Sequence, residues 1–291
     1  MTFGTVAILG PGLIGGSLAL ALAERQLAER LMIYARSPRA LDEIRIAQVQ
    51  AELTTNPSEA VREADVVILC IPIEAMPGLV LEMRDSLKPT ALVTDVGSVK
   101  GSVVGEIEPL LEGRAFWIGS HPMAGSEQTG FAAARPDLFE GAAVILTPTE
   151  HTHREARRRA EQFWTSLGAN LTILSPARHD QMVAAISHIP HLAAAALVNH
   201  AMTYGKLDLA GGGFRDSTRI ASGSPDLWTE IVLANADAIS PQVDDLIAQL
   251  GALSATLKNP DREAAKKALF DLLKAAQDSR SLLPNRRPKR S

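Results

Sequence analysis

The residues best suited to catalysis lie in segment 119–127, which reads GSHPMAGSE. This glycine-punctuated segment combines the imidazole of His121 with the hydroxyl group of Ser126 and the carboxylate of Glu127. The apolar run 115–118 comes directly before it and predicts a strand. Open α/β sheets bind ligands outside the carboxyl ends of their strands, so we expect His121 at such an edge. An imidazole, with an ordinary pKa of about 6.5, is a candidate general base there.

A second polar loop, DVGSVK at 95–100, also follows an apolar run that predicts a strand. Ser98 is therefore expected at the same edge of the sheet as His121. On topology alone, a role as the N-cap of the next helix explains Ser98 as well as a catalytic role does.

The sequence GPGLIG at 10–15 follows the first predicted strand and opens a predicted helix. In this context the three glycines permit a tight turn, close approach of the backbone to a pyrophosphate, and close packing of the helix. They are, in that order, Gly10, Gly12 and Gly15. The first N–H groups of the helix, which include those of Leu13 and Ile14, then face the anion. We predict a dinucleotide site, with a purely structural turn as the weaker alternative.

The residues after the second predicted strand bear on the choice of cofactor. Sites that prefer NAD usually place an acidic residue here to bind the ribose 2′-hydroxyl. Ala35 stands where that acid is expected, and Arg36 and Ser37 follow it. The missing carboxylate, together with a cation and a hydroxyl group, favours a 2′-phosphate. We predict NADP as the preferred cofactor, with NAD as the second choice; a solvated surface position is the alternative for Arg36.

Apolar runs of strand length alternate with amphipathic segments of helix length before residue 175. This pattern predicts an α/β Rossmann-type domain with a parallel, doubly wound sheet. The predicted strands are 6–9, 31–34, 66–71, 92–95, 115–118, 143–146 and 171–174. Ala- and Leu-rich segments follow and predict an all-α helical domain. We place the dinucleotide-binding domain at 1–174, the helical substrate and dimerisation domain at 175–280, and a basic, disordered tail at 281–291.

Composition narrows the class of protein. A length of 291 residues is sufficient for two domains with substantial cores. The net charge of −4 and the aromatic content of 4% disfavour binding to nucleic acid or to an anionic membrane. The single cysteine, Cys70, is interpreted as a buried hydrophobic residue, and with no disulfide and no basic leader the protein is predicted to be cytoplasmic. Segment 182–202 contains too many polar side chains for a membrane span and is interpreted as a buried helix.

The histidines of the second half were considered as metal ligands. His188 and His191 are three residues apart, and Pro190 is expected to disrupt the helix between them. Because no third ligand at a recognisable zinc spacing accompanies the pair, we predict no metal site. His188 is interpreted as a buried histidine with satisfied hydrogen bonds. The remaining histidines in polar surroundings are expected at the surface or at helix ends; they are His151, His153 and His179.

Five motifs, taken together, resemble those of the prephenate/arogenate dehydrogenase family, the cyclohexadienyl dehydrogenases of tyrosine biosynthesis. The motifs are GPGLIGGS at 10–17, TDVGSVK at 94–100, GSHPMAGSE at 119–127, SHIPH at 187–191 and GFRDSTRIA at 213–221. They occur in the family's order in both predicted domains, and the resemblance extends over roughly residues 4–280. The segment around His121 is its most specific element.

The resemblance implies the reaction. Members of the family remove a hydride from C4 of a cyclohexadienyl ring while the ring carboxylate leaves as CO2, which yields 4-hydroxyphenylpyruvate from prephenate or tyrosine from arogenate. By this resemblance, His121 accepts the proton of the C4 hydroxyl, and Ser98 hydrogen-bonds that hydroxyl or His121. The choice between the two substrates stays open, with a slight preference for arogenate because its use often coincides with NADP in this family.

The resemblance also implies how a dianionic substrate is bound. Arg219 matches the family's carboxylate-binding arginine, whose planar fork can bind bidentately, and Arg215 lies four residues earlier. Ser126, Glu127 and His191 are placed near the substrate. An ion pair within the helix is the alternative for Arg215, and an exposed loop position is the alternative for Glu127. Because the family commonly dimerises through its helical domain, a homodimer is expected.

Two other functions are compatible with the architecture. A hydroxyacid dehydrogenase or an imine reductase would not require His121, Ser98 and Arg219 together. A non-catalytic dinucleotide sensor would not require any of them. Both stay alternatives to the cyclohexadienyl dehydrogenase interpretation.

Overall fold

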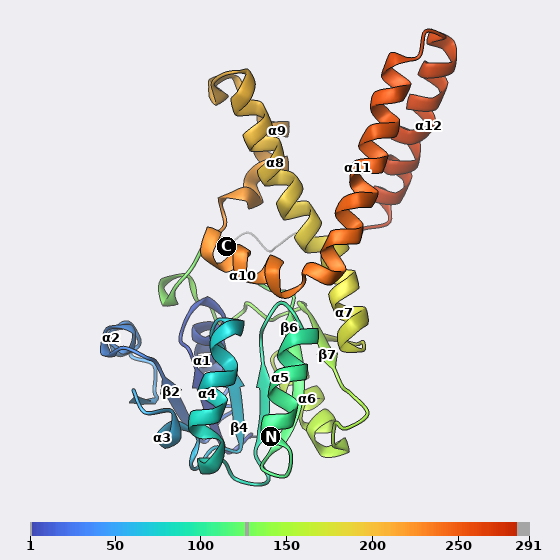
Figure 1. Ribbon diagram of the computed structural model, residues 1–291. Helices are drawn as coiled ribbons and strands as arrows, with labels where there is room; N and C mark the ends of the chain where they lie inside the picture. Colours follow the sequence, from blue (N-terminus) through green and yellow to red (C-terminus); the bar gives the residue numbers. More distant parts are fainter. Residues whose placement is uncertain (1, 126–127, 284–291) are drawn as a thin grey trace. The chain divides into compact units, whose positions relative to one another are not determined.

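Figure 1 shows the computed structural model of the protein, in which residues 2–125 and 128–283 are described. The strands are β1 (Thr5–Leu9), β2 (Arg30–Tyr34), β3 (Glu52–Thr54), β4 (Val66–Leu69), β5 (Leu92–Asp95), β6 (Phe116–Pro122), β7 (Ala143–Thr147) and β8 (Asn170–Ile173). The α-helices are α1 (Leu13–Glu24), α2 (Pro38–Ile46), α3 (Pro57–Val61), α4 (Met76–Met83), α5 (Gly101–Leu111), α6 (Arg154–Ser166), α7 (Pro176–Val183), α8 (Ile189–Tyr204), α9 (Gly212–Thr218), α10 (Pro225–Ala234), α11 (Ala236–Lys258) and α12 (Arg262–Ser281).

The eight strands form one sheet in the order β3-β2-β1-β4-β5-β6-β7-β8. Its neighbouring strands are parallel except for β6 and β7. Strands β1, β4 and β5 are buried along their full length, as is typical of parallel strands covered on both faces. The strand order reverses between β1 and β4, and doubly wound sheets bind ligands in the crevice at this point. The predicted Rossmann-type fold with a helical region after it is confirmed.

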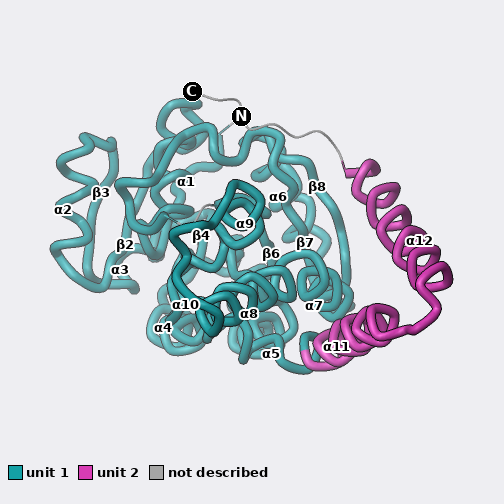
Figure 2. The backbone as a smooth tube through the Cα atoms, turned by 90° about the horizontal axis from the view of Figure 1, so that it is seen from above, with its two compact units in different colours: residues 1–239 teal, residues 240–291 magenta. Residues whose placement is uncertain are grey.

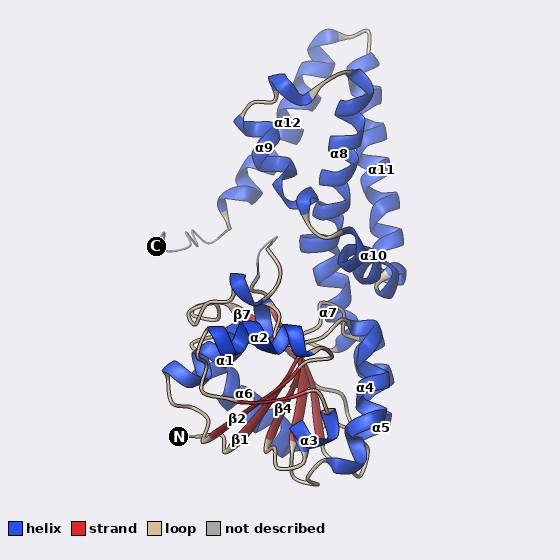
Figure 3. Cartoon of the chain, turned by 90° about the vertical axis from the view of Figure 1, so that its left-hand side faces the viewer, coloured by secondary structure: helices blue, strands red, loops and turns tan. Residues whose placement is uncertain are grey.

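Helices cover both faces of the sheet (Figure 3) and create two apolar cores. Side chains of α1, α2 and α6 belong to the first core, and side chains of α3, α4 and α5 belong to the second. Successive residues of a strand point to opposite faces, so Ile8 contributes to the first core and Leu9 to the second. The continuous apolar runs of the central strands follow from this two-sided burial.

The sheet differs from its sequence prediction at two strands. Strand β3 was not predicted because it has only three residues, ELT, and one large apolar side chain. Strand β6 continues beyond its predicted end at residue 118, because Gly119 to Pro122 pair with β7 in the antiparallel direction. The prediction of an entirely parallel sheet was therefore wrong for β6 and β7.

The apolar helix predicted over 182–202 is exposed over much of its surface, so the prediction of a buried helix was wrong. Helix α7, a π-helical turn (Ala184–His188) and α8 form one continuous helix, Pro176–Tyr204, which by length and hydropathy alone could cross a bilayer. This is weak evidence for a membrane span, because core helices of soluble proteins pass the same test, and 28% of its apolar window is buried. Pro190 lies in the first turn of α8 and does not interrupt the helix. Its exposed apolar side chains include Ile186, Leu197, Met202 and Tyr204.

The chain divides into two compact units, residues 1–239 and residues 240–291 (Figure 2). The first unit contains the sheet, its helices and α7 to α10, and the second contains α12 and most of α11. The predicted domain boundary at residue 174 coincides with the end of the last strand and stays a prediction of where the domains divide. Of the predicted tail, residues 284–291 lie outside the described residues.

Candidate active site

The glycine loop between β1 and α1 lies beside the chain that leaves β4. Gly10 has φ +109°, a conformation that L side chains rarely adopt, and a Cβ atom on it would lie 2.4 Å from the carbonyl oxygen of Cys70. A Cβ atom on Gly15 would lie 2.0 Å from the carbonyl oxygen of Gly10. Both positions therefore require glycine. Cys70 packs against the core beneath the loop, and burial raises the pKa of its thiol.

The same loop has room for a ligand at its centre. Among the described residues, no atom lies within 4 Å of a Cβ atom built on Gly12. Helix α1 begins next to it without a side-chain cap. Its first residues are Leu13 and Ile14. An open backbone and uncapped N–H groups at a helix N-terminus fit the pyrophosphate of a dinucleotide.

The three residues proposed to face the adenosine ribose follow β2. Ala35 is buried, and its N–H donates to the carbonyl oxygen of Thr54 at 3.3 Å. Arg36 is exposed. Ser37 is the N-cap of α2 and accepts a hydrogen bond from the N–H of Ala40 at 3.4 Å. The position directly after β2 thus offers no carboxylate, and an exposed arginine stands beside it.

His121 lies in β6 and not in a loop as the sequence predicted. It is opposite Ile145 of β7, beyond Ile118, the last residue of β6 that pairs with β5. The imidazole is therefore at the carboxyl edge of the parallel part of the sheet, held there by strand pairing. Its exposed fraction is 8%.

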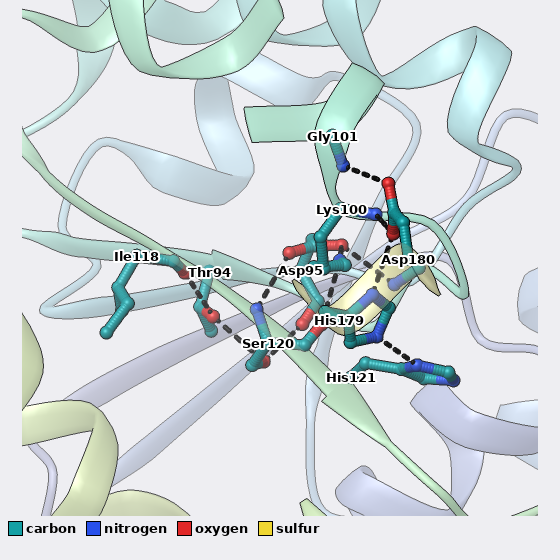
Figure 4. A network of polar contacts seen from close by, with 10 residues as sticks. Thr94, Asp95, Lys100, Gly101, Ile118, Ser120, His121, His179 and Asp180 are labelled. Carbon is teal, nitrogen blue, oxygen red and sulfur yellow. Dashed lines mark hydrogen bonds and ion pairs between the residues drawn. The ribbon is translucent and has the colours of Figure 1, made fainter. Parts of the chain in front are cut away.

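The ring of His121 contacts a second histidine (Figure 4). Nδ1 of His121 lies 2.8 Å from Nε2 of His179, and Nδ1 of His179 lies 2.7 Å from Oδ1 of Asp180. The prediction that His179 is a surface or helix-end residue was wrong: α7 packs against α5 and β7, and His179 is fully buried. The other two histidines of that group behave as predicted, because His151 is exposed and His153 is the N-cap of α6.

The Asp180 carboxylate is fixed by the N-terminus of α5. Its Oδ1 accepts a hydrogen bond from the N–H of Lys100 at 2.8 Å, and its Oδ2 accepts one from the N–H of Gly101 at 2.7 Å. A helix N-terminus stabilises a negative charge in this position. A Cβ atom on Gly101 would lie 2.7 Å from Oδ2, so the contact requires a glycine.

This chain of hydrogen bonds assigns the tautomers of the two imidazoles when both are neutral. The Asp180 carboxylate can only accept, so Nδ1 of His179 carries the proton and Nε2 of His179 has a free lone pair. Nδ1 of His121 then donates to that lone pair, which leaves Nε2 of His121 without a proton. This is the tautomer in which His121 can accept a proton from a ligand.

Burial lowers the pKa of His121 well below its usual value, and the nearby His179, Lys100 and His188 lower it further. The sequence analysis assumed an ordinary imidazole pKa. The structure instead places the imidazole in surroundings that disfavour its charged form.

Ser98 lies in the loop between β5 and α5 with a half-buried side chain. The alternative role as an N-cap does not apply: the N-cap of α5 is Lys100, and the Asp180 carboxylate accepts from the first N–H groups of the helix. Within the part of the chain that the structure describes, the Ser98 hydroxyl has no hydrogen-bond partner.

The HxxH pair lies on the continuous helix Pro176–Tyr204. His188 is buried as predicted, and its Nδ1 lies 3.0 Å from Nδ2 of Asn235; burial lowers its pKa to about 4. His191 stacks on Trp228 with ring centroids 3.5 Å apart, and its buried Nδ1 has no hydrogen-bond partner among residues 2–125 and 128–283. The described residues contain no group of three or more His, Cys, Asp or Glu side chains that could hold a metal ion. The absence of a metal site stays a prediction.

The two arginines lie on the helical turns that pack against α8. Arg215, in α9, donates from Nε to the carbonyl oxygen of Ala210 at 3.1 Å, so its described contact is with the backbone and not with an acidic neighbour in the helix. Arg219 begins a short 3-10 helix, Arg219–Ser222, and is exposed. The predicted site residues Ser126 and Glu127 lie outside the described residues.

Sequence reasoning missed part of the polar network around His121. The missed residues are Asp95, Lys100, His179, Asp180 and Asn235. Asp95 and Lys100 stand in a motif that was recognised, but no role was assigned to them. His179 and His121 are 58 residues apart in the chain, and no local pattern links them.

Comparison with known proteins covers both regions. The models for the nucleotide-binding domain and the dimerization domain of prephenate dehydrogenase match residues 18–173 and 175–275. Cyclohexadienyl dehydrogenase of Zymomonas mobilis is 34% identical over 97% of this chain and 96% of its own length. Prephenate dehydrogenase from Aquifex aeolicus, solved with hydroxyphenyl propionate and NAD+, has a TM-score of 0.89 at 29% identity and covers 97% of this chain and 98% of its own. Arogenate dehydrogenase from Synechocystis has a TM-score of 0.79 at 31% identity, with coverage of 94% and 99%.

The two family models extend over the strand of His121 and the helical region that follows, and the first of them begins at residue 18, just after the glycine loop. These similarities support an oxidoreductase that binds a nicotinamide cofactor, which agrees with the geometry of the loop. The chain belongs to the prephenate dehydrogenase family.

Proposed function

We propose that the protein catalyses the oxidative decarboxylation of arogenate, prephenate or both in tyrosine biosynthesis, with NADP as the preferred hydride acceptor. The observation that carries the proposal is the hydrogen-bond chain that leaves Nε2 of His121 without a proton at the carboxyl edge of the sheet. The loop of Gly10, Gly12 and Gly15 would hold the cofactor's pyrophosphate. When bound, the nicotinamide supplies the hydride acceptor for the reaction.

His121 acts as the general base. Nε2 accepts the proton of the substrate's C4 hydroxyl as the C4–H bond breaks, and the bond to the ring carboxylate breaks to release CO2 and leave an aromatic ring. The imidazolium that forms keeps its Nδ1 hydrogen bond to His179, whose Nδ1 contacts the Asp180 carboxylate. This carboxylate stabilises the positive charge through His179.

Ser98 is proposed to orient the same hydroxyl group. Its own hydroxyl is half-buried at the carboxyl end of β5 and has no hydrogen-bond partner among the described residues. A hydrogen bond from Ser98 would direct the substrate hydroxyl toward His121.

The substrate's two carboxylates require cations and donors. We assign Arg219 and Arg215 to this role, with Ser126, Glu127 and His191 beside them. The stacking of His191 on Trp228 holds the imidazole in a fixed orientation.

The preference for NADP rests on the residues after β2. Ala35 offers no carboxylate to a ribose 2′-hydroxyl, and the exposed Arg36 and Ser37 can bind a 2′-phosphate. Substitution Arg36→Ala should lower kcat/KM with NADP by about 10-fold to 100-fold and leave kcat/KM with NAD nearly unchanged. A wild-type enzyme with the higher kcat/KM for NAD would refute the preference.

We also propose that the protein is a cytoplasmic homodimer. Helix α12 buries none of its described side chains, although one face of it is apolar. Its exposed apolar residues include Phe270, Leu272 and Leu273. The match of residues 175–275 to a dimerization domain supports a second copy of the chain as the partner of this face.

The decisive experiment measures initial rates of NADPH and NADH formation with prephenate and with arogenate in all four combinations. Turnover in at least one combination is expected, and the ratios of kcat/KM give both preferences. A folded protein that binds dinucleotide but turns over none of the four combinations would refute the proposal and favour a sensor or another dehydrogenase.

A further inference from the structure

We propose that Lys100 is a positioning residue of this active site, whose buried ammonium group holds the strand end that carries His121 and the loop that carries Ser98. The inference rests on the proposed function. No step of the proposed reaction uses Lys100, and its side chain is fully buried together with that of Asp95.

The ammonium group of Lys100 contacts both a carboxylate and the strand of His121 (Figure 4). Nζ of Lys100 forms an ion pair with the Asp95 carboxylate and donates to the carbonyl oxygen of Ser120 at 2.9 Å. Ser120 is the residue directly before His121 in β6. The lysine is thus bonded to the peptide group that joins Ser120 to His121, and its contact limits how that strand end can move.

The second argument is that both ends of the Ser98 loop are fixed by the same pair. The Asp95 carboxylate accepts hydrogen bonds from the N–H of Gly97 at 2.8 Å and from the N–H of Ser120 at 3.0 Å. At the other end of the loop, the N–H of Lys100 donates to Asp180 at 2.8 Å. Lys100 therefore contacts the strand of His121 through its ammonium group and the carboxylate behind His179 through its backbone N–H, and its ion-pair partner Asp95 holds the start of the Ser98 loop.

The third argument is the cost of the arrangement. Burial of two charges costs desolvation energy. An apolar pair of similar volume commonly stabilises a core at least as much as a buried ion pair does. The chain packs closely around the lysine: a Cβ atom on Gly119 would lie 3.3 Å from Cδ of Lys100, although its nearest contacts would be with Thr147 and Val104. A requirement for orientation at the site explains a buried charged pair that stability alone does not require.

The charge of Lys100 has a second consequence for His121. The titratable and charged groups packed around His121 in the described structure are His179 and Asp180 of α7, His188 of the π-helical turn, Lys100 before α5 and Asp95 of β5. Burial is the main cause of the lowered pKa of His121, and Lys100 is one of the three neighbours that lower it further. Loss of this positive charge should raise the pKa of His121 and move the acid limb of kcat/KM to higher pH.

The test compares Lys100→Met with the double variant Asp95→Asn/Lys100→Met, which leaves no unpaired charge in the core. The matched control is Lys88→Met, because Lys88 pairs with Asp65 at 2.9 Å, at the opposite edge of the sheet. Thermal unfolding, kcat, KM and the pH profile of kcat/KM are measured for each.

We expect the double variant to recover most of the melting temperature that Lys100→Met loses. Its kcat should nevertheless stay at least about 10-fold below that of the wild type, while Lys88→Met keeps the wild-type kcat and pH profile. The acid limb should move to higher pH in Lys100→Met, which removes only the positive charge. A double variant with wild-type kcat would show that Lys100 is only half of a structural ion pair. If Lys100→Met does not fold, the double variant alone decides.

A titration of the His121 ring by NMR separates this inference from the proposed function. If the wild-type protein turns over no cyclohexadienyl substrate, the proposed function fails. The NMR titration requires no substrate, so it still tests whether Lys100 positions the His121 ring. A displaced His121 ring resonance in the double variant, but not in Lys88→Met, would support the inference, as would a raised pKa of His121 in Lys100→Met. An unchanged His121 ring resonance in the double variant would overturn it.

Discussion

The sheet region buries most of its apolar side chains, whereas the helical region after it leaves many of them exposed. Strands β1, β4 and β5 are completely buried, and the helices on both faces of the sheet enclose two cores. In the helical region, α8 buries only His191 and Ala194, and α12 buries none of its described side chains. The sheet region is therefore stabilised by its own packing, whereas the helical region leaves apolar side chains exposed.

The residues proposed to carry or position the catalytic base follow the same division, with one exception. His121, Ser98, Asp95 and Lys100 belong to the sheet and its loops, where close packing fixes their geometry. Helix α7 of the helical region supplies His179, which lies against the sheet and is fully buried. Helix α7 therefore acts as part of the sheet region, and the predictions below test this assignment.

The largest effect is expected where the sheet carries the chemistry itself. Substitution His121→Asn removes the proton acceptor and should lower kcat by about 1,000-fold, with dinucleotide affinity preserved. Steady-state kinetics and dinucleotide titration check this, with the exposed His151→Asn as the control. A variant that retains more than a tenth of the wild-type kcat would remove His121 from its assigned role.

His188, a buried histidine of the helical region, should make the stability of the protein depend on pH. The pKa of His188 is about 4 in the folded protein and about 6.5 when the chain is unfolded, so the unfolded state binds more protons in between. The contribution of neutral His188 to the free energy of unfolding is complete above pH 6.5. It is lost as the pH falls toward 4, and the loss is about 3 kcal/mol at most. The pKa of His121 is also lowered, so His121 acts in the same direction. Denaturant unfolding from pH 7 to pH 4 measures it, and His188→Gln should flatten the curve.

The contribution of α7 is tested by His179→Ala. Without its hydrogen-bond partner, the His121 ring loses its fixed orientation and tautomer, and kcat should fall by about 10-fold to 100-fold with little change in KM. The exposed His153→Ala serves as the control, measured by the same kinetics. Unchanged kcat in His179→Ala would mean that the sheet region alone orients the base.

The smallest effect should appear in the helical region's own packing. Phe270 in α12 is 64% exposed, and Phe270→Glu should weaken self-association by about 10-fold or more if a partner copy covers that face. Sedimentation velocity over a range of concentrations measures this. Ile46→Glu, at a residue 81% exposed in the sheet region, should leave association unchanged. Equal behaviour of both variants would contradict the proposed difference between the regions.

Much of the fold could be predicted from the sequence because its signals are local. Seven of the strands were predicted from apolar runs, which two-sided burial demands of the central strands β1, β4 and β5, and the glycine loop follows the first of them directly. Strand β3 was not predicted, because three mostly polar residues show no periodic pattern. The extension of β6 escaped because its pairing with β7 depends on a segment about 25 residues later in the chain.

By itself, the sequence determined the architecture, the dinucleotide loop and the candidacy of His121 and Ser98, because periodicity, glycine spacing and strand ends are properties of neighbouring residues. Only the tertiary structure decided that His179 is buried against His121, that Asp180 binds the N-terminus of α5 and that Lys100 contacts the peptide before His121. These contacts join segments 20 to 80 residues apart. The tautomer and the pKa of the catalytic imidazole depend on burial and on such neighbours, so they exist only in the folded protein.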